Sequence, residues 1–172
     1  MIYTRQSSKK HCSQELNFSI KMNSTNKTYK ILSYNVMSNS HLAGLLNILD
    51  IEKPDLVLLQ ELVLNTENLN ILLASKQVYR AVSNVDESDT RKPGTGVVWH
   101  ESLPVSQVAA LELNQLQICY VGPYPIVNVY QPAGSDNGPD RRQFLRDQLF
   151  RVMRRLGTKL PIIGVNFNCV IL

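Results

Sequence analysis

The chain is poor in cysteine and in long apolar runs, and each shortage excludes a class of protein. Its three cysteines, Cys12, Cys119 and Cys169, are an odd number without metal-ligand spacing, so they indicate neither a disulfide framework nor a zinc site. No apolar run approaches the roughly 20 residues that a membrane-spanning helix needs. The charged first residues are followed by no apolar segment, so no secretory signal is visible. A reducing compartment, the cytoplasm or the nucleus, and no membrane partner are therefore expected.

The remaining composition is that of an ordinary globular protein. The 172 residues are 44% hydrophobic and 19% charged, enough for one domain with a substantial apolar core. The net charge is +4 and the isoelectric point is about 9.0. This mild basic excess is compatible with a polyanionic partner, DNA or another nucleic acid, and equally with simple solubility.

The first 28 residues differ from the rest. They are rich in Ser, Asn, Lys and Gln with scattered apolar positions, which predicts a disordered tail over 1–28. The globular domain is expected to span 29–172.

Within that domain the apolar spacing alternates between strand and helix periods. Ser38 or Ser40 is a plausible cap of the first helix. The predicted strands cover 29–36, 55–61, 79–85, 96–100, 105–113, 116–121, 125–130 and 161–165, and the predicted helices cover 41–49, 66–75 and 139–156. This order indicates an α/β (α+β) fold, a two-sheet β-sandwich with helices on the outside.

The helix over 139–156 has the clearest pattern. Pro139 suits its first turn and Gly157 ends it, and its apolar face is formed by Phe144, Leu145, Leu149, Val152, Met153 and Leu156. Its basic residues are Arg141, Arg142, Arg146, Arg151, Arg154 and Arg155, against Asp140 and Asp147. Such a stripe could track a nucleic-acid backbone, or it could be a solvated outer face.

Polar residues recur where apolar strands end: Asn35, Glu61, Tyr130, Asn166 and Asn168. In layered α/β proteins, ligands bind at the carboxyl ends of the strands. An Asn and a Glu there provide oxygen ligands for Mg²⁺, which completes its shell with water and substrate phosphate. A Tyr and further Asn residues can donate hydrogen bonds to phosphate oxygens. Taken singly, Asn35 could be a turn former, Glu61 a structural ion-pair partner and Tyr130 a packed aromatic.

Four stretches together resemble the endonuclease/exonuclease/phosphatase superfamily, and within it the apurinic-endonuclease-like domain of non-LTR retrotransposons. They are Ile-Leu-Ser-Tyr-Asn-Val at 31–36, Pro-Asp-Leu-Val-Leu-Leu-Gln-Glu at 54–61, Ile-Val-Asn-Val-Tyr-Gln-Pro at 126–132 and Pro-Ile-Ile-Gly-Val-Asn-Phe-Asn-Cys-Val at 161–170. Gly-Thr-Gly-Val-Val-Trp at 94–99 matches more weakly. The resemblance runs from about Tyr29 to the last residue.

The resemblance implies a four-layer metal-dependent phosphodiesterase and a role for each strand-end residue. Asn35 resembles the asparagine that supports metal and phosphate binding, and Glu61 resembles the metal-ligating glutamate. Tyr130 resembles the tyrosine that contacts the scissile phosphate. Asn168 resembles the asparagine of the Gly-Asp-Phe-Asn motif, which orients phosphate and nucleophile.

Two departures from the family pattern predict impaired catalysis. Asn166 stands where the family has the aspartate that serves as general base, and an amide cannot accept a proton from water at neutral pH. The family's later strands, which deliver an aspartate and the catalytic histidine, have no counterpart before Leu172. His41 and His100 occur in the wrong part of the chain to replace that histidine.

The leading hypothesis is therefore a truncated, retroelement-derived, Mg²⁺-dependent DNA endonuclease domain that is impaired or inactive and that holds Mg²⁺ weakly or not at all if its site is incomplete. The alternatives are a non-catalytic nucleic-acid-binding remnant that uses the Arg-rich helix, a phosphatase or deadenylase branch of the same superfamily, and a fragment without a stable product. Because the last strand would lie at a sheet edge, self-association through that edge is also expected.

Overall fold

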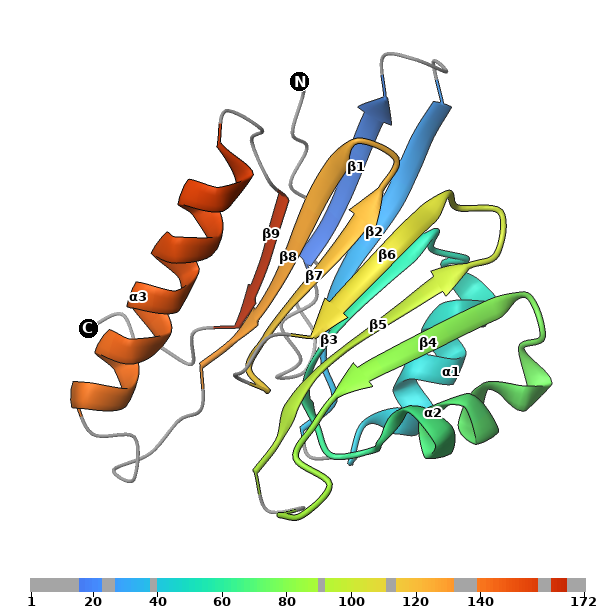
Figure 1. Cartoon of the computed structure of the whole chain (residues 1–172). Helices are drawn as coiled ribbons and strands as arrows, with labels where there is room; N and C mark the ends of the chain where they lie inside the picture. Colours follow the sequence, from blue (N-terminus) through green and yellow to red (C-terminus); the bar gives the residue numbers. More distant parts are fainter. Residues whose placement is uncertain are drawn as a thin grey trace.

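The fold consists of four layers, helix, sheet, sheet and helix (Figure 1). The computed structural model describes residues 16–22, 27–37, 40–89, 92–110, 114–131, 139–157 and 162–166. Asn168 lies outside these residues, and for Asn166 the structure describes the backbone alone. None of the described helices combines the length and apolar character that crossing a bilayer requires.

The first sheet has five strands in the order β1-β2-β3-β5-β4. Its pairs are antiparallel except β2 and β3, which run parallel. The strands are β1 (Leu16–Met22), β2 (Lys27–Asn35), β3 (Leu56–Leu62), β4 (Tyr79–Asn84) and β5 (Gly94–His100).

The second sheet has four strands in the order β6-β7-β8-β9. Two hairpins join β6, β7 and β8, whereas β9 pairs parallel with β8 after the crossover through α3. The strands are β6 (Val105–Ala110), β7 (Leu116–Val121), β8 (Tyr124–Tyr130) and β9 (Ile162–Asn166).

Helices cover the outer faces of both sheets (Figure 1). α1 (Leu42–Ile51) and α2 (Thr66–Leu72), which a 3₁₀ turn at Leu73–Ser75 extends, pack on the first sheet, and α3 (Pro139–Leu156) packs on the second. α1 connects the parallel strands β2 and β3, and α3 connects the parallel strands β8 and β9. Each of these two helices returns the chain to the start of the next strand, which is the connection that parallel pairing requires.

Three apolar clusters fill the spaces between the layers. One lies between α1, α2 and the first sheet and includes Leu45 and Leu59, and one lies between the second sheet and α3 and includes Val129 and Val152. The central cluster lies between the two sheets and is formed by Tyr29, Ile31, Leu56, Leu58, Val97, Leu103, Cys119, Val121 and Ile126. Alternate residues of β3 enter different clusters, because successive side chains of a strand point to opposite faces.

The predicted fold class is confirmed: two mixed sheets flanked by helices. The bounds predicted for α3 agree with the structure, and the strands expected at 55–61, 116–121 and 125–130 differ from β3, β7 and β8 by at most one residue. β6 covers Val105–Ala110 of the strand expected at 105–113, and 111–113 lie outside the described residues. α2 gives way to the 3₁₀ turn after Leu72, so the regular helix is shorter than expected.

The predicted tail over 1–28 contains β1, so the sheet begins earlier in the chain than expected. The segment 16–22 alternates apolar Leu16, Phe18, Ile20 and Met22 with polar residues. This is the two-residue period of a strand with one buried face. The polar composition of the whole segment outweighed that local pattern in the prediction.

The cap predicted for the first helix at Ser38 or Ser40 is corrected for Ser40, whereas Ser38 lies outside the described residues. The residue at the N-cap of α1 is His41, whose side chain makes no capping bond. Ser40 instead donates from its backbone N and its Oγ to the Met37 carbonyl, at 3.2 and 2.9 Å. The serine therefore stabilises the turn before the helix rather than the helix end.

Candidate functional site

The two parallel strand pairs end at the same end of the sandwich. β2, β3, β8 and β9 all run toward the lower end of the view in Figure 1, and β2 contacts β9 across the space between the sheets. The last residues of these strands, Asn35, Leu62, Tyr130 and Asn166, therefore come to one edge of the molecule. This is the edge where the sequence predicted the site.

Glu61 is presented by an irregularity in β3. Gln60 pairs with Thr95 of β5 and Leu62 pairs with Gly94, so the register of this ladder shifts at Glu61 by one extra residue. Its φ of 57° lies in the left-handed region, which costs a residue with a Cβ about 1–2 kcal/mol. Such bulges re-aim a side chain, and strain of this kind gathers at functional sites.

Asn35 holds the Glu61 carboxylate. Its Nδ2 donates to Glu61 Oε1 at 3.0 Å, and its Oδ1 accepts from the Met37 backbone N at 2.8 Å. The direction of the amide is fixed, because an N–H can only donate and must face the amide oxygen. Asn35 thus spans from the end of β2 to the bulge of β3. The interpretation of Asn35 as a simple turn former accounts for only one of these two bonds.

The backbone supports the same junction. Val36 N donates to Gln60 O at 2.9 Å, and His41 N donates to Val36 O at 3.1 Å. Met37 has a φ of 45° and exposes 41% of its surface at the turn that follows. The chain therefore leaves β2 through a fixed turn directly beside Glu61.

A buried polar network lies behind this junction and joins the two sheets. Gln60 of β3 is 1% exposed and donates from Nε2 to Asn128 Oδ1 at 2.8 Å and to Ser33 Oγ at 3.0 Å. Asn128 of β8 is fully buried and donates from Nδ2 to Leu59 O and Gly96 O, both at 2.9 Å. Leu59 and Gly96 oppose each other in β3 and β5, so one amide of the second sheet closes on two strands of the first.

Sequence reasoning did not assign a role to Gln60 or Asn128. A signal was present, because each is a polar residue within an otherwise apolar strand, and buried polar groups require partners. The bond between Gln60 and Asn128 could not be predicted from that signal, because 68 residues separate the two in the chain.

Tyr130 and Asn166 lie side by side at the ends of β8 and β9, where the register pairs them. Tyr130 is 3% exposed and packed, and its backbone N donates to Gln115 O at 2.9 Å. Its phosphate contact stays a prediction, as do the roles of Asn166 and Asn168.

Cys119 and His100 also carry side chains of a kind that act in catalysis, and both lie away from this edge. Burial between the sheets raises the pKa of the Cys119 thiol to about 12, so the thiol stays protonated and is no nucleophile. His100 ends β5, which runs antiparallel to β3, so it lies at the opposite end of the sheet. There its Nδ1 is 2.8 Å from Ser102 Oγ.

The donors at the edge fit a hard cation that retains most of its water. Among the residues that the structure describes, no three His, Cys, Asp or Glu side chains gather as a metal cluster. Mg²⁺ does not need such a cage, since it binds through one or two carboxylates and completes its shell with water and phosphate oxygens. Glu61 provides one carboxylate, and the fixed amide of Asn35 holds it.

Comparison with known proteins finds structures of similar fold but no match at the level of sequence. No family model matches the chain, and no curated protein matches its sequence. Among solved structures, the 3'-5' exonuclease NExo of Neisseria meningitidis matches 80% of this chain at 18% identity with a TM-score of 0.61. Humanised TDP2 of D. rerio matches 82% at 17% identity with a TM-score of 0.59, and the AP endonuclease LMAP of Leishmania major matches 74% at 19% identity with a TM-score of 0.54.

These three proteins are members of the endonuclease/exonuclease/phosphatase superfamily, and the chain has the fold of that superfamily. The resemblance identified from the four motifs is thereby confirmed at the level of the fold. The chain spans 57% of the length of NExo, 62% of TDP2 and 47% of LMAP.

The strain at Glu61 predicts that glycine is more stable than alanine at this position, the reverse of the usual order within a strand or helix. Both Glu61→Gly and Glu61→Ala remove the carboxylate, but only alanine keeps the Cβ that opposes a φ of 57°. We expect the glycine variant to have the higher free energy of unfolding, by about 1 kcal/mol. Urea denaturation followed by circular dichroism measures the difference.

Ala43 provides the matched control, because it is exposed within α1. There Ala43→Gly should lower the free energy of unfolding by about 1 kcal/mol, the ordinary order for a helix. Equal stability of the two variants at position 61, or a more stable alanine variant, would contradict the strain argument.

Proposed function

We propose that this chain is a nuclease-type phosphodiesterase domain that uses Mg²⁺ on DNA and whose catalysis is impaired by the amide at position 166. The observation that supports the proposal most is the 3.0 Å bond from Asn35 Nδ2 to Glu61 Oε1, made at the carboxyl ends of adjacent parallel strands. The carboxylate is presented by a strained bulge, and a buried network anchors the neighbouring Gln60. A structural ion pair would need neither.

In this proposal the chain contributes charge and orientation. Glu61 would hold the cation, which when bound neutralises charge on the phosphate oxygens. Asn35 keeps the carboxylate in one rotamer by donating to Oε1. Tyr130 and Asn168 are assigned hydrogen bonds to the phosphate, by their resemblance to the superfamily motifs and, for Tyr130, by its place at the end of β8.

Asn166 is the weak point of the proposed machinery. It ends β9 beside Tyr130, and by the motif resemblance it stands where the superfamily has its general base. A general base contributes roughly 10²–10⁴ in rate, and an amide cannot accept the proton of the attacking water. The chain would then bind and orient its substrate without activating the nucleophile. We also retain the retroelement origin as a proposal, which rests on the motif resemblance alone.

The proposed substrate class is supported by two of the similar structures. TDP2 of D. rerio is complexed with a single-strand DNA product, and NExo, described as a 3' phosphatase, is bound to a product DNA hairpin. Both match this chain over about three quarters of its length, at TM-scores of 0.50 and 0.54. A DNA strand with a phosphodiester or a 3'-phosphate is accordingly the substrate class to test first.

Restoring a carboxylate at position 166 should restore cleavage. We expect Asn166→Asp to nick supercoiled plasmid in Mg²⁺ faster than the unmodified protein by on the order of 10² under single-turnover conditions. Agarose gel electrophoresis measures the relaxed circle that forms. A 3'-phosphorylated oligonucleotide in the same buffer distinguishes phosphatase from endonuclease activity.

The control is the Asn166→Asp protein with Glu61→Gln added, prepared identically. It lacks the proposed metal ligand while it retains the new base, so it should return to the background rate. Equal nicking by the unmodified and the Asn166→Asp proteins would refute the role of position 166. Nicking that survives Glu61→Gln would refute the metal site, provided that a mock purification from cells without the expressed protein shows no contaminating nuclease.

We further propose that the chain self-associates through the edge of β9. Within the described residues β9 pairs with β8 alone, and the backbone groups on the other side of such a strand are suited to pairing with a second chain. Sedimentation velocity over a hundredfold range of concentration tests this. A constant monomer coefficient would refute it.

A further inference from the structure

The charge of this protein is concentrated on one helix. α3 carries six of the 18 basic residues and two of the 14 acidic residues, so the rest of the chain carries twelve of each sign. The whole net charge of +4 therefore equals that of α3 alone. A charge that only kept the protein soluble would have no reason to gather on one element.

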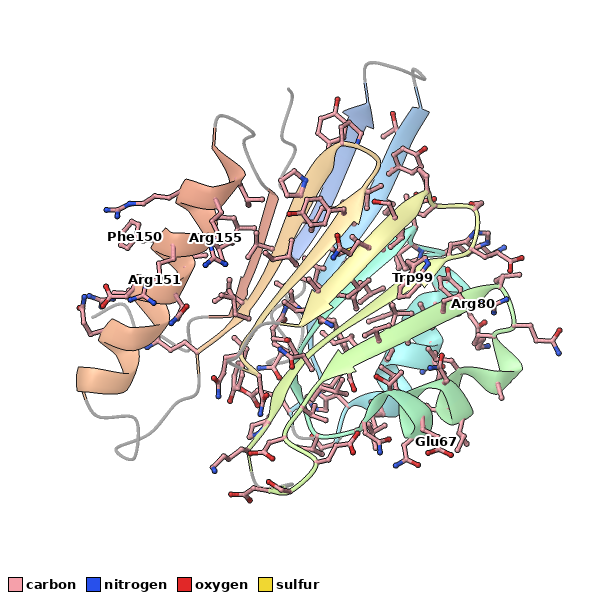
Figure 2. All side chains as sticks on the ribbon, in the orientation of Figure 1. Glu67, Arg80, Trp99, Phe150, Arg151 and Arg155 are labelled. Atoms are coloured by element: carbon pink, nitrogen blue, oxygen red, sulfur yellow. The ribbon has the colours of Figure 1, made fainter. Side chains whose placement is uncertain are left out.

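The outward face of α3 combines these cations with one aromatic ring. Arg146, Arg151, Arg154 and Arg155 are exposed, and Phe150 exposes 64% of its surface. Arg146, Phe150 and Arg154 follow one another at four-residue intervals, which places them in one stripe along the helix with about 6 Å of rise between neighbours. Figure 2 shows Phe150 on the side of α3 away from the sheets, with Arg151 and Arg155 on the same helix.

Packing does not explain the exposed ring. α3 contacts the second sheet through Val152, with Leu149 and Leu156 beside it. Phe150 belongs to none of the three apolar clusters. Of the large hydrophobic residues that the structure describes as exposed, it is the only aromatic one. A phenyl ring between two guanidinium groups is a place where a planar group can stack beside bound anions.

We propose that this stripe of α3, Arg146, Phe150 and Arg154, binds single-stranded nucleic acid, with a base stacked on Phe150 and neighbouring phosphates at the two arginines. Single strands are bound by this combination of aromatic stacking and cationic tracking of the backbone. In a duplex the faces of the bases are covered by their neighbours, so the ring would meet only the phosphate ridge. A membrane surface would require a broad apolar face, and the apolar face of α3 is already packed on the sheet.

This surface is separate from the proposed phosphodiesterase site. The stripe lies on the outer face of the second sheet, whereas Asn35 and Glu61 lie at the carboxyl ends of strands in the first sheet. Binding by the stripe therefore requires no metal and no cleavage. It would hold a strand on the outside of the sandwich whether or not the domain cuts.

The binding is measured by fluorescence anisotropy with a labelled 15-nucleotide oligo(dT) in EDTA, over a range of salt concentrations. Phe150→Ala should weaken binding about tenfold without changing the salt dependence. Phe150→Trp should retain the affinity, because it keeps a stacking surface. Arg154→Ala should weaken binding and reduce the slope of log K against log salt by about 0.7, the share of one phosphate.

Arg80→Ala is the matched control for charge. Arg80 is an exposed arginine of β4, paired with Glu101 at 3.2 Å, and Figure 2 shows it far from α3. Arg80→Ala removes the same charge as Arg154→Ala and should leave the affinity for oligo(dT) unchanged. An oligonucleotide of the same length with abasic sites has no bases to stack on Phe150. The unmodified protein should bind it as weakly as Phe150→Ala binds oligo(dT). The assay contains EDTA, which removes the divalent cation that the proposed function requires, so this result is independent of the proposed function.

Four outcomes would overturn the proposal. The first three are full affinity in Phe150→Ala, equal or tighter binding of the matching duplex, and tighter binding to phosphatidylserine vesicles than to oligo(dT) at equal charge. An equal loss in Arg80→Ala and Arg154→Ala would likewise overturn it, since it would mean that net charge alone drives binding.

Discussion

The arrangement of this molecule depends on one buried side chain, Asn128. Its amide donates to Leu59 O and Gly96 O of the opposite sheet and accepts from Gln60 Nε2. A fully buried amide without partners would cost about 1–3 kcal/mol for each unmet group, so the two sheets can meet only in the register that satisfies it. Gly164 supports the same close approach, because a Cβ there would lie 2.3 Å from Leu58 Cδ1. The network thus selects one relative position of the sheets and fixes the last residues of β3.

That fixed strand end allows a strained residue to persist beside it. Glu61 follows Gln60 directly and sits in the left-handed region, while Leu62 beyond it packs so closely on Gly96 that a Cβ there would lie 2.6 Å from Leu62 Cδ2. Asn35, anchored by the Met37 N–H, then restricts the carboxylate to one direction. The Glu61 carboxylate is therefore held in one orientation by the protein alone. Under the proposed function, the chain lacks a proton acceptor at position 166 but keeps a place for the substrate.

Local pattern was sufficient to predict much of this fold. Apolar spacing predicted both ends of α3, and the expectation that Asn35, Glu61 and Tyr130 lie near the ends of apolar strands agrees with β2, β3 and β8. Prediction from local pattern failed where a contact between distant parts of the chain determines the structure. β1 is stabilised by pairing with β2 despite a polar composition, and the bond between Gln60 and Asn128 joins strands whose proximity only the tertiary fold establishes. The direction of the Asn35 amide and the φ of Glu61 are likewise invisible in a sequence, since both follow from neighbours brought together by folding.

The claim that the Asn128 network holds the site is tested most directly by amide hydrogen exchange in Asn128→Ala. The Val36 N–H, bonded to Gln60 O at 2.9 Å, reports the site, and the His100 N–H, bonded to Asp55 O at 2.9 Å, reports the opposite end of the same sheet. If the network holds the strand end, its loss should allow local opening there. The ratio of the Val36 exchange rate to the His100 exchange rate should then be at least about tenfold higher in Asn128→Ala than in the unmodified protein. An equal change at both amides, or none at Val36, would contradict that claim.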